Sequence, residues 1–368
     1  MAINGKTLGI ALSGGGFRAT LFGLGSLWRL NDAGLLGNLD RVTSVSGGSI
    51  IAGVLAHRWS QLKFDNGRAG NFYEIVAKPI TDFCSRSIDQ SVILWGGVNP
   101  FKTAGDYLAD SYDDALFKGA TIKNGLPDAA KGQPKFIIYA TNLQTGRSFR
   151  FRQDMIADWM LGTSAKTDVS LAFAVAASSA FPPVFSPVKL TTDPDDWEGG
   201  EALPNIRALR QHIALADGGV YDNMGLESLV DNVDIALVSD AGAPFEIVES
   251  APEDYLMQLG RVRDILIDQT RALRKRWLIE EFEAKRKFGA FWGIGTRLSN
   301  FQGASGMTND TAVTMALENI PTRLNAFDAQ TQGHIINWGY ALCDISLRVN
   351  AKLPIPKATE WPVPAHTF

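Results

Sequence analysis

Ser46 stands in a sequence context that suits a catalytic nucleophile. It follows a strand-like run at 42–45, precedes two glycines, and leads into an apolar helical pattern at 50–59. A serine at a tight strand-to-helix turn presents its hydroxyl free of the sheet, and small neighbours let the two backbones pass closely. The usual elbow sequence is Gly-x-Ser-x-Gly, and here Ser44 replaces the first glycine. The context therefore predicts a nucleophilic serine.

Three consecutive glycines, Gly14, Gly15 and Gly16, separate a predicted strand at 8–12 from a predicted helix at 17–31. Glycine tolerates the backbone angles that make N–H groups converge, and a helix N-terminus adds partial positive charge. Such a loop can hold a phosphate or a developing oxyanion. The only Gly-Lys-Thr lies within the first seven residues, too early for a phosphate loop, and no clean dinucleotide fingerprint occurs. We therefore predict an oxyanion loop.

Asp217 is the first candidate for a general base. It directly follows a predicted strand at 213–216 and precedes two glycines, so its carboxylate can approach another strand end. Taken alone, the pattern is more typical of a turn aspartate that accepts hydrogen bonds from its own backbone. Asp222 and Asp240 are alternative acids. Asp240 ends a predicted strand at 235–239, but no glycine pair adjoins it.

The elements that must position these residues alternate in type. Strand, glycine turn and helix occur twice within the first 59 residues, and a further strand is predicted at 136–141. This alternation indicates an α/β domain. Residues 60–134 are helix-forming and aromatic, and we interpret them as a helical elaboration of the domain.

Composition excludes several classes of protein. Lysine and arginine total 35 and aspartate and glutamate 39, so the net charge of −4 gives no reason to expect a nucleic-acid polymer as partner. Cys84 and Cys343 are far apart, and the four histidines form no metal-ligand spacing, so we expect neither a disulfide scaffold nor a metal site. There is no signal-peptide pattern and no run of about 18 apolar residues. We expect a cytoplasmic protein with peripheral membrane contact.

The segment 255–288 carries a long helical pattern. Residues 255–287 hold nine basic and five acidic side chains, and apolar residues recur at steps of three and four. Such a helix either packs its apolar stripe on the domain, binds a partner protein, or lies on an anionic lipid surface. In the lipid interpretation, Arg274 and Lys275 contact the headgroups.

Together, the motifs resemble those of the patatin-like phospholipase family. That family carries, in order, a Gly-Gly-Gly-x-Arg/Lys loop, a serine elbow and an Asp-Gly-Gly/Ala motif. The Ala/Ser-rich run into a proline turn at 176–187 and the stretch 217–225 are also similar to family members, the latter to bacterial ones. The resemblance covers about 8–60 and 170–240.

The resemblance implies a three-layer α/β/α domain with a mostly parallel central sheet. We expect this domain over 1–350, followed by a C-terminal tail at 351–368. It also implies a lipid acyl hydrolase of phospholipase A or lysophospholipase type, with a lipid or phospholipid substrate and no cofactor. An acyltransferase using the same residues and an inactive lipid-binding module are the alternatives.

The family works through a Ser–Asp dyad. The resemblance assigns Ser46 as nucleophile, Asp217 as base, and the backbone N–H groups of Gly14, Gly15, Gly16 and Gly47 as the oxyanion hole. Arg18 either braces the glycine loop, binds a headgroup phosphate in the substrate, or is a plain surface arginine. No histidine falls within a motif, so none is expected to be catalytic. Oligomeric state does not follow from the sequence.

Overall fold

The computed structural model describes residues 5–88 and 103–368. An 11-stranded sheet runs through it in the order β10-β8-β7-β6-β5-β2-β1-β12-β13. Outside this order, β11 pairs with β5, and β9 pairs with β11. The last five strands of this order are parallel to one another. They are β5 (Lys135–Asn142), β2 (Arg41–Val45), β1 (Leu8–Leu12), β12 (Ile235–Asp240) and β13 (Phe288–Gly293).

Antiparallel strands extend the sheet on the β5 side. They are β6 (Arg147–Phe151), β7 (Ile156–Asp158), β8 (Gly162–Ser164), β9 (Val188–Thr191), β10 (Trp197–Glu198) and β11 (His212–Asp217). A separate hairpin pairs β3 (Phe64–Asp65) with β4 (Arg68–Ala69). The strands expected at 8–12, 136–141, 213–216 and 235–239 are confirmed as β1, β5, β11 and β12.

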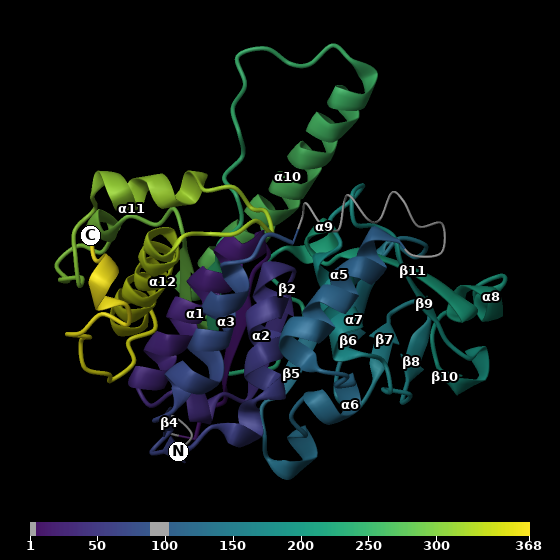
Figure 1. The fold of residues 1–368 in the computed structure, drawn as a ribbon, viewed down its shortest axis with the longest axis horizontal. Helices are drawn as coiled ribbons and strands as arrows, with labels where there is room; N and C mark the ends of the chain where they lie inside the picture. The colour runs from purple at the N-terminus through teal and green to yellow at the C-terminus, as the bar shows by residue number, and fades with distance from the viewer. Residues whose placement is uncertain (1–4, 89–102) are drawn as a thin grey trace.

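Helices pack on both faces of the central strands, which gives the three layers expected of the fold. Alternate β1 residues Leu8, Ile10 and Leu12 point into the larger core, beneath α1 (Gly16–Asp32), α2 (Gly47–His57) and α12 (Ala329–Val349) (Figure 1). Ala11 points to the opposite face, into a smaller core that includes Met224 and Leu278. That face is covered by α9 (Gly219–Asp222), the residues after it, and the end of α10 (Tyr255–Glu283).

The predicted helical elaboration at 60–134 is part of the main core where the structure describes it. It contains α3 (Lys78–Cys84), α5 (Ala104–Tyr112) and α6 (Ile122–Gly125). Phe83, Leu108 and Tyr112 from these helices are buried in the larger core. Residues 89–102 of this segment lie outside the described residues. The other α-helices of the described ranges are α7 (Leu171–Ser179), α8 (Ile206–Gln211) and α11 (Ala312–Ala316).

Residues 351–368, expected as a tail, lie against α12. The Asn337 side chain donates to the carbonyl oxygens of Val363 and His366 at 2.9 and 2.8 Å, and the Phe368 ring lies 5.8 Å from the Trp338 ring. We therefore propose a single domain that includes this segment.

The helix expected at 255–287 ends at Glu283, because the chain then enters β13. The two basic residues that the lipid interpretation assigns to headgroups also contact the domain. Arg274 lies 3.7 Å from Asp222 and stacks on Tyr221, and the Lys275 ammonium lies over the Phe291 ring. Lys275 is also exposed to solvent, so contact of this segment with lipid stays a prediction. No helix of the described residues is long and apolar enough to cross a bilayer.

Candidate active site

The ends of two strands meet on the edge of β5. β2 pairs with the first part of β5, ending with Val45 beside Tyr139, and β11 pairs antiparallel with the last part, ending with Asp217 beside Ala140. Since β6 occupies the other edge of β5, β2 and β11 share one edge and approach each other end to end. The residue after β2 is Ser46, so this register brings it to Asp217.

Ser46 occupies a strained turn between β2 and α2. Its φ of 51° and ψ of −123° are unusual for a residue with a side chain, and its side chain is almost buried, with 8% of the residue exposed. A side chain at Gly47 would overlap the carbonyl oxygen of Gly16, so only glycine lets this turn touch the glycine loop through the backbone. The close approach of the two backbones therefore requires glycine at position 47, next to Ser46.

Asp217 is buried and hydrogen-bonded to the Ser46 side chain. Its Oδ1 also accepts the Gly219 N–H at 2.7 Å. Burial raises the pKa of Asp217 to about 6, although the hydrogen bonds from Ser46 and Gly219 act in the opposite direction. A carboxylate with this pKa is ionised at neutral pH and accepts a proton more readily than an ordinary aspartate.

The C-terminal end of α7 ties Ser46 and Asp217 together. The Ser178 hydroxyl accepts the Ser46 N–H at 2.9 Å and lies 2.9 Å from the Ser49 hydroxyl. Just after α7, the Ala180 carbonyl oxygen accepts the Asp217 N–H at 2.9 Å. The same segment therefore holds Asp217 as well as Ser46. The sequence pattern predicted no role for Ser178, although it lies in the Ala/Ser-rich run of the family resemblance. A hydroxyl in a run otherwise rich in alanine was the available signal.

Three backbone N–H groups near Ser46 have no hydrogen-bond partner among the described residues. They belong to Gly15, Gly16 and Gly47, the last two being the first residues of α1 and α2. Gly14 differs, because its N–H donates to the carbonyl oxygen of Asn223 at 3.0 Å. The expectation that Gly14 contributes an oxyanion donor is therefore corrected: its amide is already bound.

Asn223 is a second residue for which the sequence predicted no role. A side chain added at Gly14 would overlap the Asn223 amide oxygen and lie 3.1 Å from the Ser46 Cβ. Asn223 thus borders the glycine loop beside the serine, while its carbonyl holds the loop in place.

Arg18 faces inward rather than toward a substrate. It is 1% exposed, and its guanidinium donates to the carbonyl oxygens of Ala241, Glu318 and Ile320. Burial, with the nearby Arg271 charge, lowers its pKa to about 10, which leaves it charged at neutral pH. The geometry supports the bracing interpretation, and the headgroup contact expected of Arg18 is corrected because its donors are bound to backbone.

The alternative acids are bound elsewhere. Asp222 accepts the N–H groups of Met224 and Leu226 at 3.1 and 2.7 Å. Burial alone would raise the pKa of Asp240, but its two hydrogen bonds from Arg271, at 3.0 and 2.8 Å, hold that pKa below its ordinary value. Asp217, by contrast, is hydrogen-bonded to the Ser46 side chain.

Other sites suggested by residue type do not form in the described part of the chain. It contains no hydrogen bond from a histidine to Ser46 or Asp217, and no group of three or more His, Cys, Asp or Glu side chains that could hold a metal ion.

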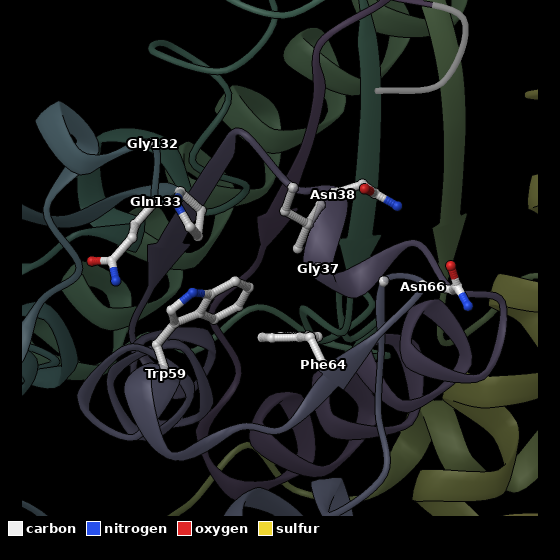
Figure 2. A pocket seen from close by; sticks show the side chains of 10 residues that line it. Gly37, Asn38, Trp59, Phe64, Asn66, Gly132 and Gln133 are labelled. Carbon is white, nitrogen blue, oxygen red and sulfur yellow. The ribbon is translucent and has the colours of Figure 1, made fainter. Parts of the chain in front are cut away.

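A hollow of about 410 Å³ lies at the N-terminal ends of β2 and β5, whereas Ser46 follows the C-terminal end of β2. Figure 2 shows its lining, in which the Trp59 and Phe64 rings lie 5.0 Å apart. Leu39 and Pro134, which precede β2 and β5, also border it. Because Ser46 follows the other end of β2, this hollow is not part of the site.

Comparisons with known proteins agree with the fold. The sequence model described as patatin-like phospholipase matches residues 10–230. Human GIVD cytosolic phospholipase A2 is similar in structure with a TM-score of 0.52 and 12% identity, covering 94% of this chain and 60% of that chain. Its complex with methyl gamma-linolenyl fluorophosphonate and terbium chloride gives a TM-score of 0.49 at 13% identity, covering 95% and 58%.

VipD from Legionella pneumophila gives a TM-score of 0.40 at 15% identity, covering 94% of this chain and 67% of that chain. This chain thus spans about 60% of the length of the human enzyme in these structures. No curated protein matches the sequence.

Proposed function

The chain belongs to the patatin-like phospholipase family, and from that premise we propose that it hydrolyses carboxyl esters of lipids through Ser46 and Asp217. The observation that carries the proposal is the buried Asp217 carboxylate, with its pKa raised to about 6, hydrogen-bonded to a serine in a strained turn. Together these groups supply a nucleophile and a base.

In the acylation step, the Ser46 Oγ attacks the ester carbonyl while Asp217 accepts the hydroxyl proton. The carbonyl oxygen becomes negatively charged, and the N–H groups of Gly15, Gly16 and Gly47 are available to stabilise it. When the tetrahedral intermediate collapses, Asp217 gives the proton to the departing alcohol, and an acyl-serine remains.

In the deacylation step, Asp217 accepts a proton from water as the water oxygen attacks the acyl-serine. Collapse releases the fatty acid, and the proton returns to Ser46. Arg18 contributes as a brace, since it ties the start of α1 to Ala241 and to residues 318–320. We do not assign it a contact with the substrate.

The test is chemical labelling combined with product analysis. A fluorophosphonate should label the wild-type protein once, at Ser46, and Ser46→Ala should remain folded without labelling or esterase activity. Labelling at Ser13, Ser44 or Ser49 would overturn the assignment of the nucleophile.

Mass spectrometry of products from mixed bacterial phospholipids should show free fatty acids and lysophospholipids, or further deacylated products, and none with Ser46→Ala. Acyl groups found only on another acceptor would indicate acyl transfer. The absence of any product or label in a folded protein would indicate a binding module.

A further inference from the structure

Asn223 lies where two parts of the proposed active site meet. It directly follows α9, the short helix that the chain forms after Asp217, and its carbonyl oxygen accepts the Gly14 N–H at 3.0 Å. The turn that follows Asp217 is therefore bonded to the glycine loop that precedes α1. Because Gly14 borders Ser46, this bond fixes the backbone of Asn223 beside the nucleophile.

The Asn223 side chain borders both Ser46 and Asp217. A side chain added at Gly14 would overlap the Asn223 Oδ1 and lie 3.1 Å from the Ser46 Cβ. A side chain added at Gly219 would lie 2.6 Å from the same Oδ1 and 3.0 Å from the Asp217 Oδ1. Since neither glycine has a side chain, nothing at these two positions shields the amide oxygen from the nucleophile and the base.

This amide has no other task in the fold. Within residues 5–88 and 103–368, the Asn223 side chain neither donates nor accepts a hydrogen bond. The residue is half-buried, whereas Ser46 is 8% and Asp217 3% exposed. Asn223 is therefore the most open of the three side chains, on the side from which a molecule reaches the other two.

Hydroxyl groups near the glycine loop are bound within the protein. The Ser13 Oγ accepts the Ala241 N–H at 2.8 Å, and the Thr20 Oγ1 donates to the Gly47 carbonyl oxygen at 2.8 Å. Unlike these hydroxyl groups, the Asn223 amide is left to bind a molecule that enters the site.

The deacylation step requires such a group, because water carries two hydrogen atoms. Asp217 accepts one of them as a proton while the water oxygen attacks the acyl-serine. An ordered water molecule in a protein forms about three hydrogen bonds, so its second hydrogen needs another acceptor. That acceptor must lie close to both Asp217 and Ser46, since the water has to reach the base and the acyl carbonyl together.

We propose that the Asn223 Oδ1 is this acceptor, which makes Asn223 a further catalytic residue; the inference rests on the proposed function. Asp217 takes the proton that leaves the water, Asn223 holds the hydrogen that stays, and the oxygen bonds to the acyl carbon. Collapse breaks the bond to Ser46, whose oxygen regains the proton from Asp217, and the second hydrogen leaves with the carboxylic acid. An alcohol offers no second hydrogen, so Asn223 favours hydrolysis over acyl transfer to an alcohol.

The first test compares water with methanol as acceptor of the acyl group. Asn223→Leu keeps the approximate size of the side chain and removes its hydrogen-bond acceptor. With a soluble short-chain ester in dilute methanol, the ratio of methyl ester to free acid should rise about tenfold over wild type, because only water loses a hydrogen bond. An unchanged ratio would overturn the proposal.

The second readout separates acylation from deacylation. In Asn223→Leu, kcat/KM for the ester and the rate of fluorophosphonate labelling at Ser46 should stay near wild type, because the attack by Ser46 does not involve water. Any fall in kcat should be matched by a fall in KM. If labelling and kcat/KM fall as much as kcat, Asn223 only shapes the glycine loop, and the proposal is wrong.

Two further variants separate the acceptor from the fold. Asn223→Asp keeps an acceptor of the same shape, so its methyl ester ratio should stay near wild type at pH 9; a ratio as high as that of Asn223→Leu would contradict the proposal. The alkaline pH is needed because a second carboxylate raises the pKa of Asp217. Asn350→Leu is the matched control. Asn350, at the end of α12, is exposed and its amide is likewise unbonded in the described ranges, so all readings should equal wild type.

The same assay distinguishes this proposal from the proposed function. If Ser46→Ala still forms acid and methyl ester, or if wild type forms neither, the assignment of Ser46 as nucleophile fails. If both products depend on Ser46 but their ratio is the same in wild type and Asn223→Leu, only the role of Asn223 fails.

Discussion

Replacing Asp217 by asparagine should greatly reduce turnover and, at neutral pH, stabilise the fold. The carboxylate is buried with its pKa raised to about 6, compared with an ordinary 3.8. Each pKa unit corresponds to about 1.4 kcal/mol, so the ionised Asp217 costs the folded protein on the order of 3 kcal/mol above pH 7. Asparagine keeps the shape and the acceptor for the Gly219 N–H but carries no charge.

The sign of the pH dependence follows from proton binding. Between about pH 4 and pH 6, the folded state holds the Asp217 proton more firmly than the unfolded state does, so the wild-type free energy of unfolding falls as the pH rises through this window. The amide that replaces the carboxylate in Asp217→Asn does not titrate. The advantage of Asp217→Asn should therefore be below about 1 kcal/mol at pH 4 and approach its full value above pH 7.

The assay is urea unfolding of wild type and Asp217→Asn at pH 4, 5.5 and 8, beside hydrolysis of a soluble short-chain ester at pH 8. We expect turnover to fall by a factor of about 10² to 10⁴ while the midpoint at pH 8 rises. A variant that is less stable than wild type by the same amount at every pH would refute the reasoning. It would show that Asp217 is a turn aspartate whose backbone hydrogen bonds stabilise the fold.

The same pKa predicts that kcat/KM for the short-chain ester falls roughly tenfold between pH 7 and pH 5, as Asp217 becomes protonated; a flat profile over this range would argue against it as the base. Ser178→Ala leaves the buried Ser46 N–H without its acceptor, which should lower kcat roughly 10- to 100-fold. Its control is Ser179→Ala, since among the described residues the Ser179 hydroxyl bonds only to the Val175 carbonyl of its own helix, and this variant should retain most activity. Arg18→Met removes the donor to three carbonyl groups, of which that of Ala241 is buried, and should reduce the free energy of unfolding by about 3 kcal/mol, measured with urea. Arg207→Met, which breaks only an exposed ion pair, should leave the unfolding midpoint unchanged.

The sequence by itself determined the local parts of this protein. The strands and the helices that follow Gly14–Gly16 and Gly47–Gly48 were predicted at nearly their observed bounds, because strand alternation, helical periodicity and glycine turns are short-range properties. The order of the motifs identified the family, which the match over residues 10–230 confirms.

Only the tertiary structure decided which groups meet. Ser46 and Asp217 are 171 positions apart, and they approach because β2 and β11 end against each other on one edge of β5. The register of that edge depends on long-range strand pairing, which no local pattern encodes.

The same reason explains the corrections. Whether a donor is free depends on what the rest of the chain brings to it: the Gly14 N–H is bound by Asn223, and Arg18 by three carbonyls from distant segments. Likewise, the periodicity of α10 showed that the helix has an apolar side, but not which side the domain would cover. In the structure, Arg274 lies beside the buried Asp222 carboxylate and the Tyr221 ring, and Lys275 lies over the Phe291 ring. Apolar side chains on other sides of α10 are left exposed.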